Sequence, residues 1–464
     1  MRCKNKILFF GLWLLLTIVW LCSLIEITTL VSYHNPFTAG ELFAWFTANG
    51  YETNDIVGYC LRHVSPYWVV CSLIYVGCCW LLWRAVSSTK RWAKGMACLV
   101  TSGLLLPFCA PFVPHNLLGE IMCVANQINA LREHDNDNVM FSYHATRTDT
   151  TSQKEVYVLS VGESLCYRNI SLNGGYQRET TPLLAHLDDL CLYSDYYATA
   201  TLTQHALPML FCGVDAEHFF AHYARKTMAA AFHEAGFQTA LISHRAQLMN
   251  NRYHNYLTRD FDTVLMVEHD SLIASRLEML CSKSNKLFVV THYLGNHLFY
   301  TNRADTDLIW RPDYNADHRA KSDSLFLNAY DNSIRYTDRM LNSEIDVLKS
   351  QDCISAWLFV SDHGEYIGSQ VSGHGYTYCP TIEEYHVPLM AWTSKAYQTQ
   401  LPDRVTNMVK HKDEPISADY VFQSVLDMAG VSIKDRTDKS IFLADMPVCR
   451  RLLLLPDGQT TMQL

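Results

Sequence analysis

The chain has 464 residues, a length that accommodates two to four domains. Hydrophobic residues make up 49% and charged residues 18% of the sequence, which excludes a mainly disordered protein. The net charge of −9 and the lack of a long basic run argue against a dedicated nucleic-acid-binding protein, so we expect no nucleic-acid partner.

Three uncharged runs occupy most of the first 115 residues, at 7–25, 66–83 and 95–114. Each run is about as long as a helix that crosses the hydrocarbon core of a membrane. The first run has the alternative of a cleaved signal peptide, but no small-residue cleavage site follows it, so we favour an uncleaved anchor. We therefore predict a membrane module over residues 1–115 with three transmembrane helices.

Basic residues set the orientation of this module. They precede the first run and fill the loop between the second and third runs: Arg2, Lys4, Lys6, Arg84, Lys90, Arg91 and Lys94. The segment between the first two runs is instead mainly acidic. The chain that follows the third run is therefore predicted to face the extracytoplasmic side.

An amphipathic segment at 117–132 predicts an interfacial helix, and the polar stretch that follows predicts a linker, so that residues 116–153 join two domains. Beyond them, β-rich apolar runs alternate with helical segments. The runs lie at 155–161, 239–242, 263–267, 287–290 and 356–360, and the helical segments include 216–235 and 322–349. This alternation predicts an α/β domain over 154–464, with a central, mostly parallel sheet flanked by helices.

Polar side chains follow three of these runs. Glu163 comes after the first, the segment 291–297 with two histidines comes after the fourth, and Asp362 with His363 comes after the fifth. Because the carboxyl ends of parallel strands share one edge of a sheet, we expect these side chains to gather there. Carboxylate and imidazole together suit a divalent transition metal, most simply zinc.

The segment 161–182, which contains Gly162-Glu163-Ser164 and Arg178-Glu179-Thr180-Thr181-Pro182, resembles the opening motif of the bacterial phosphoethanolamine transferases. This family belongs to the sulfatase-like branch of the alkaline phosphatase superfamily. The resemblance continues, in order and spacing, at 201–208, 294–297, 328–332, 361–365, 373–375 and 387–388. The Asp-His-Gly motif is typical of the whole superfamily, whereas the first block is specific to the transferases.

The resemblance implies a zinc site and a threonine nucleophile. Its four implied ligands are Glu163, Thr203, Asp362 and His363. The family nucleophile lies five residues before a proline, which indicates Thr203 before Pro208, with Thr201 as the alternative. His297 and His374 match the family histidines near the transferred phosphate, and Glu365 and Asn296 are expected to line the substrate site.

The implied activity is transfer of phosphoethanolamine from phosphatidylethanolamine through a covalent threonine intermediate. The acceptor stays open among lipid A, lipopolysaccharide core and other envelope glycans. The implied cofactor is Zn²⁺, with Mn²⁺ as the weaker alternative. The implied location is the bacterial inner membrane, as a multi-pass protein with its catalytic domain in the periplasm.

The sequence departs from the family pattern in three ways. Family members usually carry five spans, against three here. Tyr197 and Met209 stand where lipid A-modifying members have cysteines, which weakens assignment to that subgroup. A basic pocket residue of some members has no clear equivalent, and His244, Arg245 and Gln247 are the candidates.

Four alternative functions remain. A sulfatase would need a Cys/Ser-x-Pro-x-Arg motif, which the sequence lacks. A phosphoglycerol transferase that uses phosphatidylglycerol, or a sulfatase-like phosphodiesterase, would share the metal motif but not the Arg-Glu-Thr-Thr-Pro block. A non-catalytic membrane protein is disfavoured because every expected ligand is present.

Overall fold

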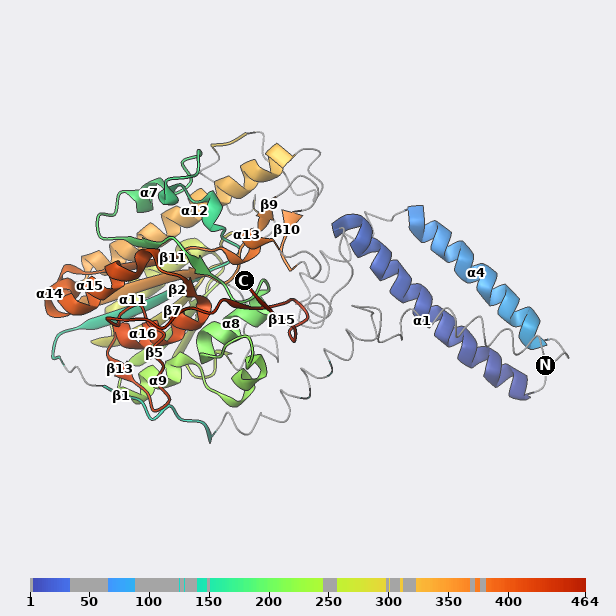
Figure 1. Cartoon of the computed structure of the whole chain (residues 1–464), viewed down its shortest axis with the longest axis horizontal. Helices are drawn as coiled ribbons and strands as arrows, with labels where there is room; N and C mark the ends of the chain where they lie inside the picture. The colour runs from blue at the N-terminus through green and yellow to red at the C-terminus, as the bar shows by residue number, and fades with distance from the viewer. Residues whose placement is uncertain are drawn as a thin grey trace. The chain divides into compact units, whose positions relative to one another are not determined.

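The computed structural model describes residues 3–33, 66–87, 125, 129, 140–147, 151–244, 257–297, 300, 309–311, 323–367, 372–375 and 381–464 (Figure 1). The chain divides into two compact units, Met1–Ile128 and Asn129–Leu464. The third predicted span at 95–114 lies outside the described residues, as does nearly all of the predicted interfacial helix at 117–132. The boundaries predicted at residues 115 and 153 stay predictions.

The first unit contains two long apolar helices, α1 (Cys3–Tyr33) and α4 (Pro66–Ser87). Their segments Phe9–Thr28 and Pro66–Arg84 are long and apolar enough to cross a membrane. The two helices contact each other through Trp20 and Tyr75, whose rings stack 4.9 Å apart. Few of the other apolar side chains of these segments are buried, as expected for helices that face lipid.

The second unit is built on a seven-stranded sheet with the order β3-β11-β8-β2-β7-β5-β6. Its strands are β2 (Glu155–Gly162), β3 (Cys191–Tyr193), β5 (Gln238–Ser243), β6 (Thr263–Met266), β7 (Lys286–His292), β8 (Ile354–Ser361) and β11 (Leu389–Thr393). The five strands β8, β2, β7, β5 and β6 are parallel, and β11 runs antiparallel to both of its neighbours. The predicted α/β fold with a mostly parallel sheet is confirmed.

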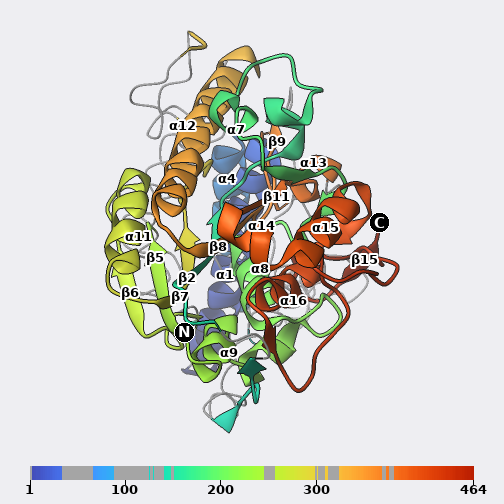
Figure 2. The same cartoon turned by 90° about the vertical axis from the view of Figure 1, so that its left-hand side faces the viewer.

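Helices cover both faces of this sheet, which explains why its central strands are apolar without alternation. Figure 2 shows α11 (Ile273–Cys281) and α12 (Asp323–Ser350) on one side, and α14 (Lys395–Gln400), α15 (Pro402–Lys410) and α16 (Val421–Met428) on the other. The predicted helix at 322–349 is thus confirmed as α12. Its buried stripe at helical spacing packs on the sheet and comprises Tyr330, Ile334, Leu341, Ile345 and Leu348.

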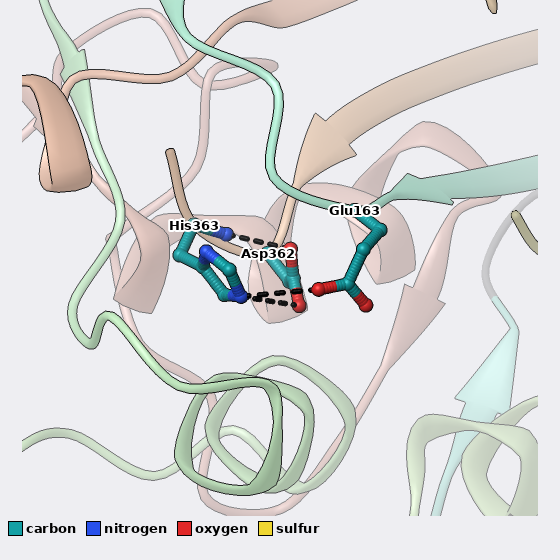
Figure 3. Close-up of side chains that lie close together, drawn as sticks. All are labelled: Glu163, Asp362 and His363. Atoms are coloured by element: carbon teal, nitrogen blue, oxygen red, sulfur yellow. Dashed lines mark hydrogen bonds and ion pairs between the residues drawn. The ribbon is translucent and has the colours of Figure 1, made fainter. Parts of the chain in front are cut away.

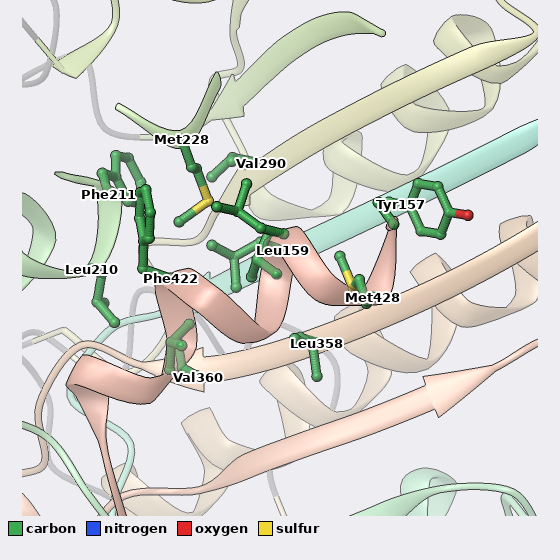
Figure 4. Packing of buried hydrophobic residues seen from close by; sticks show 14 of the residues in the cluster. Tyr157, Leu159, Leu210, Phe211, Met228, Val290, Leu358, Val360, Phe422 and Met428 are labelled. Atoms are coloured by element: carbon green, nitrogen blue, oxygen red, sulfur yellow. The ribbon is translucent and has the colours of Figure 1, made fainter. Parts of the chain in front are cut away.

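The opposite face holds the larger hydrophobic core (Figure 4). There α16 lies over the central strands, so that Phe422 and Met428 pack with Leu159 and Leu358. Phe211 joins the same core from α8 (Thr203–Cys212). This helix begins at the predicted nucleophile, so the core fixes the helix that carries it.

The other helices and strands are short. The helices are α7 (Pro182–Ala185), α9 (Met228–Glu234) and α13 (Ile382–Tyr385). The strands are β1 (Thr146–Arg147), β4 (Tyr196–Tyr197), β9 (Tyr366–Ile367), β10 (Ser372–Gly373), β12 (Ile416–Ser417), β13 (Val431–Ser432), β14 (Leu452–Leu454) and β15 (Thr461–Gln463).

One local prediction is corrected. The segment 216–235 is not one helix but a 3-10 helix at Phe219–Ala224 and then α9, because Thr227 is extended and its backbone N–H binds the Asp260 carboxylate at 2.6 Å.

The last residues of the predicted linker have contacts within the second unit. Tyr143 is buried there, and β1 pairs with β13.

Candidate active site

The first component of the site is Glu163, directly after the central strand β2. The turn that follows is tight, and Ser164 has a φ of 57°, which side chains other than glycine rarely adopt. Tyr330 of α12 holds this turn: its hydroxyl accepts from the Cys166 N–H at 2.9 Å and donates to the Ser164 carbonyl at 2.7 Å. The turn therefore holds the Glu163 carboxylate near His363, at the edge of the sheet where β2 and β8 end.

The second component is Asp362 and His363, directly after β8. Gly162 and Ser361 are register partners of the paired strands β2 and β8, so the residues that follow them meet at the same edge. Gly364 then passes so close to the 383 carbonyl that a Cβ would lie 2.0 Å from its oxygen. Only glycine fits at that crossing.

The third component is Thr203, the first residue of α8. Its Oγ1 donates to the two carboxylate oxygens of Glu163 at 3.1 and 3.3 Å and lies 3.4 Å from His363 Nε2. Thr201 is placed differently, because it is buried beside Tyr385. The geometry therefore favours Thr203 over Thr201 as the nucleophile.

The carboxylates of Glu163 and Asp362 and the imidazole of His363 form a compact, fully buried triad (Figure 3). One ligand atom of each lies within 4.8 Å of the others. His363 Nε2 is 3.1 Å from Glu163 Oε1 and 3.5 Å from Asp362 Oδ2. Burial alone lowers the pKa of His363, but the two carboxylates and the carbonyl of the next residue raise it to about 10.

This donor set fits a divalent cation. His363 Nδ1 lies 2.8 Å from the Gly364 carbonyl, which directs Nε2 toward the carboxylates. Two carboxylates buried this close repel each other unless a positive charge lies between them, and a protonated His363 or a divalent cation bound by all three residues supplies that charge. Three oxygen or nitrogen ligands with a fourth position left for water or substrate are typical of a catalytic zinc site.

Next to the triad lies a histidine–carboxylate pair. His374 Nδ1 is 3.0 Å from Glu365 Oε2, and the His374 ring centre lies 4.1 Å from that of His363. Glu365 is only 1% exposed, whereas His374 is partly exposed. The geometry therefore favours Glu365 as a residue that orients His374, and its predicted contact with substrate stays a prediction.

The loop 293–297 contributes the remaining predicted residues. Asn296 is fully buried, and its carboxamide binds Ser333 at 2.7 Å and Thr337 at 3.1 Å, both on α12. This arrangement favours a role in holding the loop over direct substrate contact. His297 ends the described part of the loop and is half-buried, and its phosphate-binding role stays a prediction.

The sequence profile described as Sulfatase matches residues 155–431, more than half of the chain, and this range contains the whole triad. The chain belongs to the sulfatase family. Within that family it is 24% identical to the phosphoethanolamine transferase EptC of Escherichia coli O18:K1:H7, over 89% of this chain and 79% of that protein. It spans about half the length (54%) of the curated relatives named EptA.

Two solved structures share the fold. The C-terminal periplasmic domain of Escherichia coli EptC, in complex with Zn, superposes with a TM-score of 0.58 at 21% identity, over 67% of this chain and 92% of that one. Lipooligosaccharide phosphoethanolamine transferase A from Neisseria meningitidis, an integral membrane protein, gives a TM-score of 0.70 at 19% identity, over 93% and 88%. The predicted resemblance to the phosphoethanolamine transferases is confirmed.

Several residues of this sulfatase-family site were not singled out by the sequence. Tyr330 lies in the motif at 328–332, but the sequence of that motif does not indicate that its hydroxyl holds the Ser164 turn. Asp270 follows β6 and binds two amides of the 293–297 loop. Its position shortly after a predicted strand is the sequence signal that indicates it. Arg245 and Gln247 lie outside the described residues, whereas His244 is described and contacts Asp270.

The cysteines in the described part of the second unit are free thiols: Cys166, Cys191, Cys212, Cys281, Cys353 and Cys449. Cys379 lies outside the described residues. Tyr197 occupies one of the family cysteine positions and stacks on His386 at 4.7 Å. An aromatic contact therefore anchors the segment before Thr203.

Proposed function

We propose that the protein transfers phosphoethanolamine from phosphatidylethanolamine to an acceptor in the bacterial envelope, through a covalent intermediate on Thr203. The observation that carries this proposal is the contact of Thr203 Oγ1 with both Glu163 and His363 at the buried triad. A hydroxyl in that place is positioned for nucleophilic attack. The relatives named phosphoethanolamine transferases support the choice of the transferred group.

We further propose that Zn²⁺ is the metal, held by Glu163, Asp362, His363 and Thr203. The donor set supports zinc over Mn²⁺ because it includes imidazole. The relative solved in complex with Zn adds support. Zinc, when bound, supplies Lewis acidity: it lowers the pKa of a neighbouring hydroxyl and polarises the phosphoryl group.

In the first half-reaction, Thr203 Oγ1 attacks the phosphorus of phosphatidylethanolamine. The Oγ1–P bond forms as the bond between phosphorus and the diacylglycerol oxygen breaks. The Thr203 proton passes toward Glu163, its hydrogen-bond acceptor at 3.1 Å. His374, oriented by Glu365, gives a proton to the departing diacylglycerol oxygen. The N-terminus of α8 favours the negative phosphoryl group beside it.

In the second half-reaction, the acceptor oxygen attacks the same phosphorus and its proton returns to His374. The Oγ1–P bond breaks, and Thr203 recovers its proton. His297 is proposed to bind the non-bridging oxygens in both steps. The reaction is therefore a ping-pong transfer between two substrates that use one site in turn.

The acceptor is proposed to be a lipid or glycan of the envelope, such as lipid A or the lipopolysaccharide core. The name of the lipooligosaccharide-modifying relative supports this class. We propose a multi-pass protein of the inner membrane, with the second unit in the periplasm, supported by the two long apolar helices and the charge asymmetry of their flanks. Membrane anchoring keeps the site close to a lipid donor.

The test is intact-mass analysis of the full chain in detergent, incubated with zinc and phosphatidylethanolamine and followed by peptide mapping. We expect one phosphoethanolamine group on Thr203. Thr203→Ala should carry none, and Thr201→Ala should still be modified, because Thr201 is buried beside Tyr385 whereas the Thr203 hydroxyl contacts Glu163. Later addition of a lipopolysaccharide extract should remove the group.

Three outcomes would overturn the proposal. A glycerophosphate group acquired from phosphatidylglycerol instead would indicate a phosphoglycerol transferase. Release of free phosphoethanolamine to water with no acceptor dependence would indicate a sulfatase-like phosphodiesterase. Modification that persists in Thr203→Ala and disappears in Thr201→Ala would move the nucleophile.

A further inference from the structure

The loop 293–297 crosses directly over the backbone of Glu163. The Tyr293 N–H donates to the carbonyl of Val161 at 2.9 Å, and the Asn296 N–H donates to the carbonyl of Glu163 at 3.0 Å. Gly295 has a φ of +46°, and a Cβ there would lie 3.3 Å from the Glu163 nitrogen. The path of the loop over this backbone therefore determines the place of His297 at the loop's end.

One buried carboxylate fixes the middle of this loop from the neighbouring strand connection. Asp270 is 1% exposed and begins a 3-10 helix (Asp270–Leu272) shortly after β6. Its Oδ1 accepts from the Leu294 N–H at 3.0 Å, and its Oδ2 accepts from the Gly295 N–H at 3.1 Å. Each carboxylate oxygen thus binds one of two consecutive loop amides.

A third contact to Asp270 comes from a histidine at the end of a neighbouring strand. His244, which directly follows β5, places Nδ1 2.8 Å from Asp270 Oδ1. The His244 backbone N–H also donates to the carbonyl of His292 at 3.0 Å, at the end of β7. Asp270 therefore joins the ends of three adjacent parallel strands, β6, β5 and β7, at the edge of the sheet that carries the site.

We propose that Asp270 is a positioning residue for catalysis: its carboxylate sets the 293–297 loop against Glu163 and thereby places His297 for the transferred phosphoryl group. The inference rests on the proposed function, because His297 has a catalytic role only if phosphoryl transfer occurs at this site. It assigns Asp270 no contact with substrate. Its effect on the reaction passes through His297.

The test combines a double-mutant cycle with hydrogen exchange on the full chain in detergent. Asp270→Asn keeps the shape of the side chain but turns an acceptor oxygen into a donor that faces one of the loop amides. Asp338→Asn is the matched control. Asp338 is also buried, and its two oxygens accept from the consecutive amides of Leu183 and Leu184 at 2.9 Å, on α7.

The first readout is the rate of Thr203 modification by phosphatidylethanolamine. We expect Asp270→Asn to lower it about 10- to 100-fold in the otherwise native chain, as for a site misplaced by about an ångström. In a His297→Ala background, the same substitution should change the rate by less than about twofold. Asp338→Asn should have the same small effect in both backgrounds.

The second readout is amide exchange of the peptide that contains 293–297. Exchange there should accelerate in Asp270→Asn but not in Asp338→Asn, while peptides from β8 stay unchanged in both as a check on folding. Asp270→Glu, which keeps the charge but shifts the carboxylate, serves as a second variant and should show the same two effects.

If the fold-losses in rate of Asp270→Asn and His297→Ala multiply in the double variant, the inference is overturned, because Asp270 then acts independently of His297. Unchanged exchange of the loop would overturn it as well. If the native chain carries no group on Thr203, the proposed function fails by itself. The exchange readout then still decides whether Asp270 holds the loop.

Discussion

Replacing Tyr330 by phenylalanine should weaken the site more than the loss of one hydroxyl suggests. Tyr330 is fully buried, and its hydroxyl accepts from the Cys166 N–H and donates to the Ser164 carbonyl. Tyr330→Phe leaves both backbone groups buried without that partner, and each unsatisfied group costs about 1–3 kcal/mol. We therefore expect the free energy of unfolding to fall by about 2–6 kcal/mol.

Tyr193→Phe is the matched control for this substitution. Tyr193 is equally buried, but its hydroxyl holds no strained turn: it donates to the Met408 carbonyl at 2.9 Å and lies beside the Cys191 thiol. It should lower the free energy of unfolding by about half as much or less. Both variants are compared by thermal unfolding of the full chain in detergent, under identical conditions.

The two variants should differ further in zinc binding. Without the Tyr330 hydroxyl, the turn at Ser164 is less constrained, and the Glu163 carboxylate can move away from its position in the triad. Loss of such support for a metal ligand typically lowers metal affinity about 10- to 100-fold. Competition with a coloured chelator should show this loss for Tyr330→Phe and not for Tyr193→Phe. Equal unfolding midpoints and equal zinc affinities for the two variants would refute the reasoning.

Three further predictions concern buried groups of the second unit. Glu163→Gln should lose most of its bound zinc by elemental analysis while its circular dichroism stays native, because one of two triad charges disappears; full zinc retention would contradict the assignment. Burial raises the pKa of the Cys166 thiol to about 12, so almost no reactive thiolate exists near pH 8 and iodoacetamide should label Cys166 only after denaturation; rapid labelling of native protein would be inconsistent with this burial. Burial also raises the pKa of Glu344, despite its hydrogen bonds from Ser160 and Trp357. The contribution of Glu344 to the free energy of unfolding is therefore complete below its pKa in the unfolded chain and is lost as pH rises through its pKa in the folded chain. Glu344→Gln should therefore unfold at a higher temperature than the native chain near pH 8, by a margin that shrinks toward acid pH, and a margin independent of pH would count against the raised pKa.

Much of the fold was available from local sequence pattern. The five parallel strands and α12 are confirmed near the predicted bounds, because continuous apolar runs and a helical stripe are properties of short segments. The segment 216–235 was predicted wrongly because a contact distant in sequence overrides its local pattern. Its helical pattern is continuous, but the Asp260 carboxylate, which is distant in sequence, binds the Thr227 amide and keeps that residue extended.

The sequence by itself also predicted a cluster of possible metal ligands. Glu163, Asp362 and His363 follow predicted strands, and parallel strands bring their ends to one edge, so the sequence predicted that these side chains gather there; the pairing of β2 with β8 in the structure brings them together. The choice of Thr203 over Thr201 needed more. The structure starts α8 at Thr203 and places the Thr203 hydroxyl against Glu163, which supports Thr203 as the proposed nucleophile.

Only the tertiary structure decided how the site is held in place. Tyr330 and Ser164 are 166 positions apart, and Asp270 binds amides 24 and 25 positions away. Contacts of this kind leave no periodic signal, because one tyrosine hydroxyl or one carboxylate meets a backbone group of arbitrary sequence. Residue types fix the chemistry of the site, whereas its geometry depends on distant segments that meet only in the folded chain.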